Sequence, residues 1–202
     1  MKDFKTDIKD YLLREKAALD KINIDELNDV LNCMLKHYEN EDTIYVMGNG
    51  GSASTASHMV CDFNKGVSLN LPKKFNLVCL NDNLAELMAI ANDMSYEDVF
   101  WYPLQTKLKP TDCVLAISGS GNSKNVIKAV EYAKEIGCDI IGVTGYDGGK
   151  LKKIANYHLD AGVNDMQISE DLHLIFNHLM MQILWKHLMN ENGQEAIYKI
   201  NK

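Results

Sequence analysis

The sequence predicts an α/β fold: one sheet of five mainly parallel strands flanked by helices, with a helical extension at the N-terminus. Two patterns predict it. Short apolar runs alternate with segments of helical periodicity from residue 43 onward. These runs are almost continuously apolar, which is typical of parallel strands buried on both faces. The size agrees, because 202 residues of which 46% are hydrophobic can bury a substantial core and are unlike a disordered chain.

The N-terminal segment over residues 4–37 is predicted to be helical, because apolar residues recur at roughly helical spacing. A break near Asn23 divides it into two helices, and Asp25 is the expected N-cap of the second helix. We therefore expect three parts, namely a helical extension, an α/β domain and a polar tail, over residues 1–38, 39–190 and 191–202.

The elements of the domain follow one another in a regular order. The run Thr43–Gly48 is β-rich and stops at a glycine, and Asp112–Ser118 stops at a glycine–serine turn. Strands are expected at 43–48, 75–80, 112–118, 139–145 and 157–162. Helices are expected at 52–64, 83–93, 95–108, 148–155 and 169–190, and residues 119–137 are expected to be a glycine turn followed by a helix.

Charge excludes one class of partner. The formal net charge is −7, from 28 acidic and 21 basic residues, and the basic residues form no block longer than a pair. Such a surface argues against nucleic-acid binding, which needs many Lys and Arg contacts to phosphate. The N-terminus carries charges throughout and is unlike a signal peptide, and no apolar run reaches the ~20 residues that span a bilayer. We expect no membrane association.

The five cysteines indicate a reducing, cytoplasmic setting, since none forms a CxxC pair or a disulfide framework. Cys61 lies near the candidate site described next. The other four lie in apolar runs, where cysteine usually behaves as a small hydrophobic residue: Cys33, Cys79, Cys113 and Cys138.

Two glycine–serine turns predict a phosphate-binding site. Gly48–Ser52 and Ser118–Ser123 each follow a strand and open a helix, so both lie at the carboxyl ends of the strands, where ligands of α/β sheets bind. Glycine lets the backbone approach a ligand closely, and a helix N-terminus favours an anion. Neither turn has the Walker or dinucleotide-binding spacing. One turn alone would more often be structural, but two in one sheet favour phosphate.

Two further pairs of polar residues share helix faces. His58 and Asp62 are four residues apart and point the same way from one helix. Glu170 and His178, eight residues apart, can share a broad face of the last helix. Isolated helical histidines such as His37 are expected to be partly exposed residues without a functional role, as is His187.

These motifs together resemble a known family. GNGGSASTASH, ISGSGNSKNVIKAVEYAKEIG and VTGYDGGKL are similar to the sugar isomerase (SIS) domain family. Within it, the sequence most resembles the bacterial phosphoheptose isomerases, which convert sedoheptulose 7-phosphate to D-glycero-D-manno-heptose 7-phosphate. The resemblance covers about residues 5–190 and extends to ANDMSYEDVF.

The resemblance implies a zinc site and a pair of proton-transferring residues. The family uses a histidine and a glutamate of the first helix with a glutamine and a histidine of the last. The histidines match His58 and His178, but the glutamate position is Asp62 and the glutamine position is Glu170. Asp62 or Glu170 is then the expected base and His178 the acid. Two histidines and two carboxylates suit Zn²⁺ and would also accept another divalent ion.

The resemblance also implies a substrate-binding set and an assembly. His173, beside Glu170, is a second-ranked alternative to His178 as a ligand. Relatives are homotetramers with active sites at subunit boundaries, so a homotetramer is expected here. The residues expected to bind the phosphorylated sugar are Asn49, Gly50, Gly51, Ser52, Asn92, Asp93, Ser118, Gly119, Ser120, Ser123 and Glu170.

Two alternatives to a heptose isomerase remain at this point. The chain could isomerise another phosphosugar, for example in surface-polysaccharide synthesis, with Asp62 reflecting a different substrate shape. It could also be a non-catalytic sugar-phosphate sensor or adaptor, a reading favoured by the altered carboxylates at Asp62 and Glu170. The two histidines and the serines of the turns argue against a non-catalytic role.

Overall fold

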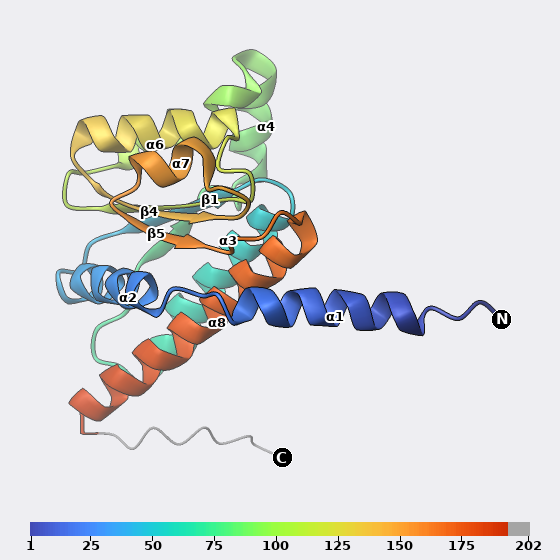
Figure 1. Cartoon of the computed structure of the whole chain (residues 1–202). Coiled ribbons are helices and arrows are strands. Elements are labelled where there is room, and N and C mark those ends of the chain that lie inside the picture. The colour runs from blue at the N-terminus through green and yellow to red at the C-terminus, as the bar shows by residue number, and fades with distance from the viewer. Residues whose placement is uncertain (194–202) are drawn as a thin grey trace.

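The protein is built in three layers, with one sheet between two groups of helices (Figure 1). The computed structural model describes residues 1–193. The predicted fold class is confirmed. Two separate apolar cores, one on each face of the sheet, hold the layers together.

All strands of the sheet are parallel, and their order is β2-β1-β3-β4-β5. Ile44 at the start of β1 pairs with Leu77 of β2 on one side and with Cys113 of β3 on the other. The chain therefore goes from β1 to β2 on one side and then crosses back to β3 on the other side of β1. Ligands bind at such a reversal in parallel sheets. The strands are β1 (Ile44–Gly48), β2 (Leu77–Cys79), β3 (Cys113–Ser118), β4 (Asp139–Thr144) and β5 (Tyr157–Asp160).

The helices divide between the two faces of the sheet. One face is covered by α2 (Ile24–Glu39), α3 (Gly51–Cys61) and α8 (Met166–Glu191), whose apolar residues form one core. The opposite face is covered by α4 (Leu84–Asp93), α5 (Trp101–Lys107), α6 (Lys124–Ile136) and α7 (Gly149–Ile154). Two short helices complete the chain, a π-helix η1 (Asp62–Val67) and a 3₁₀ helix η2 (Tyr96–Asp98).

The N-terminal helix α1 (Lys5–Leu19) projects from the body of the protein (Figure 1). It is attached to α8 through Tyr11, which donates a hydrogen bond to Asp171. Its outer end carries exposed apolar side chains: Phe4, Ile8, Leu12 and Leu13. A helix that exposes such residues has an apolar surface available for a partner.

The second N-terminal helix, α2, is part of the main core rather than of the projecting arm, since Val30 and Met34 are fully buried. The expected N-cap of this helix was wrong. Asn23 is the cap, and its side chain accepts hydrogen bonds from the backbone N–H groups of Asp25 and Glu26. Asn and Asp cap helices equally well, so the residue nearest the break could not be chosen from type alone.

At the other end, α8 runs to Glu191, one residue into the expected polar tail, most of which lies outside the described residues. Within residues 1–193, none of the helices combines the length and apolarity needed to cross a membrane.

Candidate functional site

A cavity of about 270 Å³ lies at the point where the strand order reverses, between the ends of β1 and β3. It is bounded by both glycine–serine turns and by the start of α8. Nine of the eleven predicted substrate-binding residues line it, together with Ile117 and Met166: Asn49, Gly50, Gly51, Ser52, Ser118, Gly119, Ser120, Ser123 and Glu170. The sequence thus placed both turns at one ligand-sized cavity.

The first turn leaves the start of α3 open toward the cavity. Gly50 precedes α3 with a φ of 55°, a conformation that side chains disfavour. Because glycine has no side chain to cap the helix, the first N–H groups of α3 remain available. By contrast, Asn83 caps α4 and Asp165 caps α8 with their side chains. An uncapped N-terminus facing a cavity is suited to an anion.

The second turn has the same property at the start of α6. Ser123 occupies the N-cap position of α6 but makes no capping hydrogen bond, and its hydroxyl instead lies 3.2 Å from that of Ser118. Ser120 accepts a hydrogen bond from the N–H of Asn122 at 3.2 Å. Hydroxyl groups and free amides from two helices therefore converge on one space. This is the donor set that a phosphate requires.

Glu170 places a carboxylate in the same space. A Cβ atom built on Gly51 would overlap this carboxylate, so the glycine leaves free the space that the carboxylate occupies. The helices α3 and α8 then run side by side in the same direction, since His58 meets His178 further along. The negative charge of Glu170 therefore stands at the N-terminus of α3, where it is itself favoured.

Three of the four predicted metal ligands come together further along these helices. Donor atoms of His58, Asp62 and His178 lie within 4.8 Å of one another. One carboxylate oxygen of Asp62 is 3.4 Å from Nε2 of His58 and 3.7 Å from Nε2 of His178, and the two imidazole nitrogens are 3.5 Å apart. The predicted fourth ligand, Glu170, is outside this group.

Asp62 reaches the histidines from an unusual helical turn. It is the first residue of the π-helix η1, where the chain contains an extra residue per turn. Such turns are frequent at functional sites. Two histidines and one carboxylate form the donor set of catalytic zinc sites, which keep a fourth position open. The residues present therefore fit a divalent cation.

A residue that sequence reasoning missed holds Asp62 in place. Asn177 is fully buried and donates a hydrogen bond of 2.8 Å from its side-chain amide to Asp62. Its side-chain oxygen has no hydrogen-bond partner among the described residues. The signal available in the sequence was its position directly before His178, but nothing there showed that its side chain turns toward Asp62.

Other predicted residues lie apart from this cluster. Asn92 and Asp93 end α4, are exposed and are hydrogen-bonded to each other at 2.8 Å, outside the lining of the cavity. Their role in substrate binding stays a prediction. The nearby Tyr96 does reach the first turn, because its hydroxyl donates to the side chain of Asn49 at 2.9 Å.

His173, the alternative ligand, points into the interior. It is 1% exposed, and its Nε2 lies 3.0 Å from the carbonyl oxygen of Thr144. Burial lowers its pKa, against the opposing effects of that carbonyl and of Asp160. It therefore belongs to the core and not to the metal-ligand group.

The chain is similar to known proteins in both sequence and fold. The model of the SIS domain family matches residues 9–145, which is more than half of the chain. The chain belongs to the SIS domain family. The SIS domain here is similar over most of its length to curated relatives that carry an enzyme name.

A protein of Helicobacter pylori (strain Shi470) named phosphoheptose isomerase is 33% identical over 189 residues, covering 92% of this chain and 97% of the relative. One of Thermoplasma acidophilum, named probable phosphoheptose isomerase, is 34% identical over 178 residues, covering 88% and 97%. Among solved structures, the phosphoheptose isomerase of Neisseria gonorrhoeae superposes with a TM-score of 0.83 at 26% identity, covering 90% of this SIS chain and 98% of that one.

Proposed function

We propose that this SIS protein is a phosphosugar aldose–ketose isomerase whose substrate is sedoheptulose 7-phosphate and whose product is D-glycero-D-manno-heptose 7-phosphate. One observation carries the proposal: a cavity formed by two uncapped helix starts and a row of serine hydroxyls lies on the same two helices, α3 and α8, as the cluster of His58, Asp62 and His178. The names of the relatives in Helicobacter pylori and Thermoplasma acidophilum support it.

In this proposal the turns hold the phosphate and the far end of the sugar. The amides at the starts of α3 and α6 and the hydroxyls of Ser52, Ser118, Ser120 and Ser123 are the donors. A phosphate bound away from the reacting carbons fixes their position, so that binding energy contributes to the chemical step.

Isomerisation moves a proton between C1 and C2 through an enediol. Asp62 or Glu170 takes the proton from carbon, and His178 serves the oxygen atoms as the acid. Asn177 holds the carboxylate of Asp62 by its hydrogen bond, so Asp62 is oriented before the substrate arrives. A base must come within about 2.6–3.2 Å of the proton donor, and the shorter side chain of aspartate makes that orientation important.

His58, Asp62 and His178 would hold a divalent cation of the zinc class, and Glu170 is the predicted fourth ligand from the family. When bound, such a cation supplies electrostatic stabilisation to the negative charge that develops on the enediolate oxygen.

We further propose that the protein works in the cytoplasm as a homotetramer in which neighbouring chains complete each site. The side chains of His58 and His178 are 44% and 48% exposed in the single chain, which is more than a water-excluding catalytic site allows. The exposed apolar end of α1 offers a surface for assembly.

The test is turnover of sedoheptulose 7-phosphate by the purified protein, with and without added Zn²⁺, compared with Asp62→Asn. We expect metal-dependent turnover that falls by a factor on the order of 10²–10⁴ in this variant, the usual contribution of a general base. The matched control is Asp29→Asn, which removes an exposed carboxylate of α2 and should leave turnover unchanged.

Absence of turnover, with sugar-phosphate binding retained, would overturn the heptose isomerase. Turnover of a different phosphosugar would then assign another isomerase. Binding without turnover of any aldose or ketose phosphate, and without bound metal, would indicate a sensor or adaptor.

A further inference from the structure

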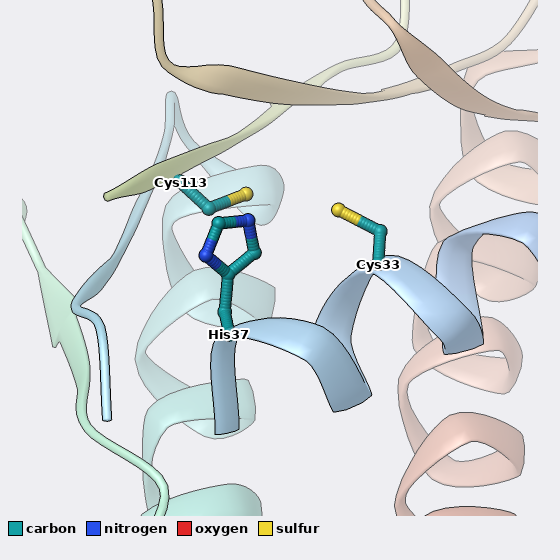
Figure 2. Close-up of side chains that lie close together, drawn as sticks. All are labelled: Cys33, His37 and Cys113. Carbon is teal, nitrogen blue, oxygen red and sulfur yellow. The ribbon is translucent and has the colours of Figure 1, made fainter. Parts of the chain in front are cut away.

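A second group of metal-ligating side chains lies inside the protein, apart from the cavity. Cys33 and His37 are four residues apart on α2, and Cys113 is the first residue of β3. All three are buried, and one donor atom from each lies within 4.8 Å of the others. Figure 2 shows the two thiol groups close to the imidazole ring. The expectation that His37 is a partly exposed residue was therefore wrong, because the side chain is buried within this group.

The spacing of these atoms is close to that around a tetrahedral ion. Zinc binds thiolate sulfur at about 2.3 Å and imidazole nitrogen at about 2.0–2.1 Å, so neighbouring ligand atoms lie roughly 3.3–3.8 Å apart. Separations within 4.8 Å therefore need only a small inward movement of the side chains.

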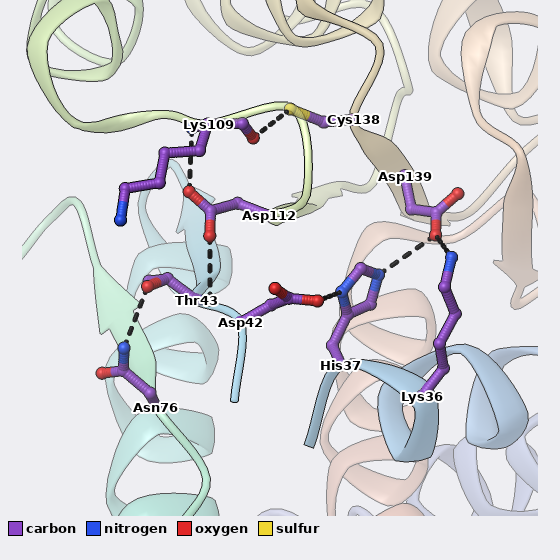
Figure 3. Close-up of polar contacts among 9 residues, drawn as sticks. All are labelled: Lys36, His37, Asp42, Thr43, Asn76, Lys109, Asp112, Cys138 and Asp139. Carbon is purple, nitrogen blue, oxygen red and sulfur yellow. Dashed lines mark hydrogen bonds and ion pairs between the residues drawn. The ribbon is translucent and has the colours of Figure 1, made fainter. Parts of the chain in front are cut away.

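Asp139 lies beside this group, although its carboxylate is outside the 4.8 Å limit that the other three donor atoms meet. It begins β4 and pairs in register with Cys113 on β3. Its carboxylate oxygen is 3.1 Å from Nε2 of His37, close to the separation of two ligands on one ion (Figure 3). The same oxygen is 2.7 Å from the ammonium group of Lys36. Both side chains of this pair are partly exposed, which gives an ion a route inward.

Asp42 orients the histidine for coordination. Its carboxylate lies 3.0 Å from Nδ1 of His37 (Figure 3). In the tautomer that carries its proton on Nδ1, the lone pair is on Nε2, the nitrogen on the side of Asp139. A carboxylate behind a ligating histidine is the usual arrangement in zinc sites.

A divalent cation would neutralise two thiolates, and Lys36 already pairs with the Asp139 carboxylate. A buried charge needs such compensation.

We propose that Cys33, His37 and Cys113, with Asp139 as the fourth ligand, bind one thiophilic divalent cation of the zinc class in a closed, structural site. The site fastens α2 to the first residues of β3 and β4. These lie at the amino ends of the strands, whereas the proposed isomerase cavity lies at the carboxyl ends. The cation therefore stabilises the fold and takes no part in the chemistry.

Cobalt substitution tests the proposal on the reduced, metal-free full-length chain. Co²⁺ bound to thiolate gives an intense near-ultraviolet charge-transfer absorption that the histidine–carboxylate site cannot produce. We expect this absorption to saturate at a single equivalent and to persist in His58→Ala, which disables the other metal site. Added Zn²⁺ should displace the Co²⁺ and abolish this absorption.

Variants assign the ligands. Cys33→Ser and Cys113→Ser should each lose the charge-transfer absorption and the rise in melting temperature that Zn²⁺ produces. Cys138→Ser is the matched control. Cys138 is also buried, but its thiol donates a hydrogen bond to the carbonyl oxygen of Lys109 and lies outside the cluster. It should behave as the unmodified protein.

X-ray absorption of the zinc-loaded His58→Ala protein keeps the test decisive if the serine variants do not fold. Two sulfur atoms at about 2.3 Å from zinc are expected. The proposal is overturned by zinc without sulfur neighbours, by missing cobalt–thiolate absorption in protein whose thiols are reduced, or by absorption that survives in Cys113→Ser. His37 would then be only a cation held between Asp42 and Asp139.

Discussion

At the scale of single residues, Glu170 is one of the two positions, with Asp62, where the sequence departs from the pattern that the resemblance implies. Its carboxylate lies beside Gly51, inside the cavity that both turns line. A phosphate bound there would share the start of α3 with a negative charge. The substitution therefore places charge repulsion, absent with a glutamine, directly in the proposed anion site.

Glu170→Gln is expected to strengthen phosphate binding, because it removes this repulsion while keeping the size of the side chain. We expect the Kd of inorganic phosphate and of the sugar phosphate to fall by a factor on the order of ten at low salt. Isothermal titration measures it. Glu135→Gln, an exposed position of α6, is the control, and equal affinity in both variants would contradict the prediction.

His173 predicts how stability depends on pH. Burial lowers its pKa from the ordinary 6.5, against the carbonyl of Thr144 and the charge of Asp160. The unfolded chain therefore binds a proton more readily than the native protein, so the free energy of unfolding falls as pH decreases through 6.5. Asp160, whose pKa is also lowered despite its burial, chiefly by His158 and Lys152, adds to this loss at more acidic pH.

His173→Gln should flatten the upper part of this dependence, since glutamine can still donate to Thr144 but does not titrate. Urea unfolding at several pH values between about 5.5 and 7.5 measures the slope. An unchanged slope would assign the loss of stability to other groups.

At the scale of elements, the two turns differ in how strongly they require glycine. Gly50 and Gly121 both have positive φ, near 55° and 61°. A Cβ atom on Gly50 would meet open space, whereas one on Gly121 would overlap the carbonyl group of Gly148 in the next loop. The second turn is thus packed at Gly121 directly against the backbone of Gly148.

Gly121→Ala is expected to lower the free energy of unfolding by about 2–4 kcal/mol, and Gly50→Ala by about 1 kcal/mol, the cost of the left-handed backbone alone. Denaturant unfolding of the two variants provides a matched comparison. Equal losses would show that close approach to Gly148 adds nothing.

The elements were largely predictable, and the exceptions have physical reasons. Every strand lies within two residues of its predicted bounds, because apolar runs between turns mark buried strands directly. The π-helix at Asp62 was not predicted, since an extra residue in a helical turn depends on what packs against it. The prediction of one helix over 52–64 therefore merged α3 with the start of η1.

At the scale of the whole molecule, the projecting arm α1 predicts assembly. Leu12→Lys places a charge on its exposed apolar surface and should shift a tetramer toward smaller species, because the buried lysine would lack a partner. Light scattering coupled to size exclusion measures the mass. Leu84→Lys, also at an exposed leucine, is the control and should leave the mass unchanged. A tetramer that persists in Leu12→Lys would show that α1 is not part of the interface.

Long-range juxtapositions were the least predictable feature of the molecule. The two turns could be paired from the sequence because parallel strands present their ends at one edge of the sheet. The group of Cys33, His37 and Cys113 could not, since it joins a helix to a strand start eighty residues later on the opposite edge. Only burial of the four cysteines in apolar runs was foreseen, and it is confirmed.

In the proposed isomerase, the parallel run of α3 and α8 would set the length of sugar that the site accepts. Gly51 at the phosphate end and His58 at the reacting end are seven residues apart, which is roughly 10 Å along a helix. A sugar anchored by its phosphate reaches His58 with its carbonyl only if its carbon chain spans that gap. A triose or tetrose phosphate, held the same way, would be too short to reach the histidines, so the rise of the helix would select the length of the substrate.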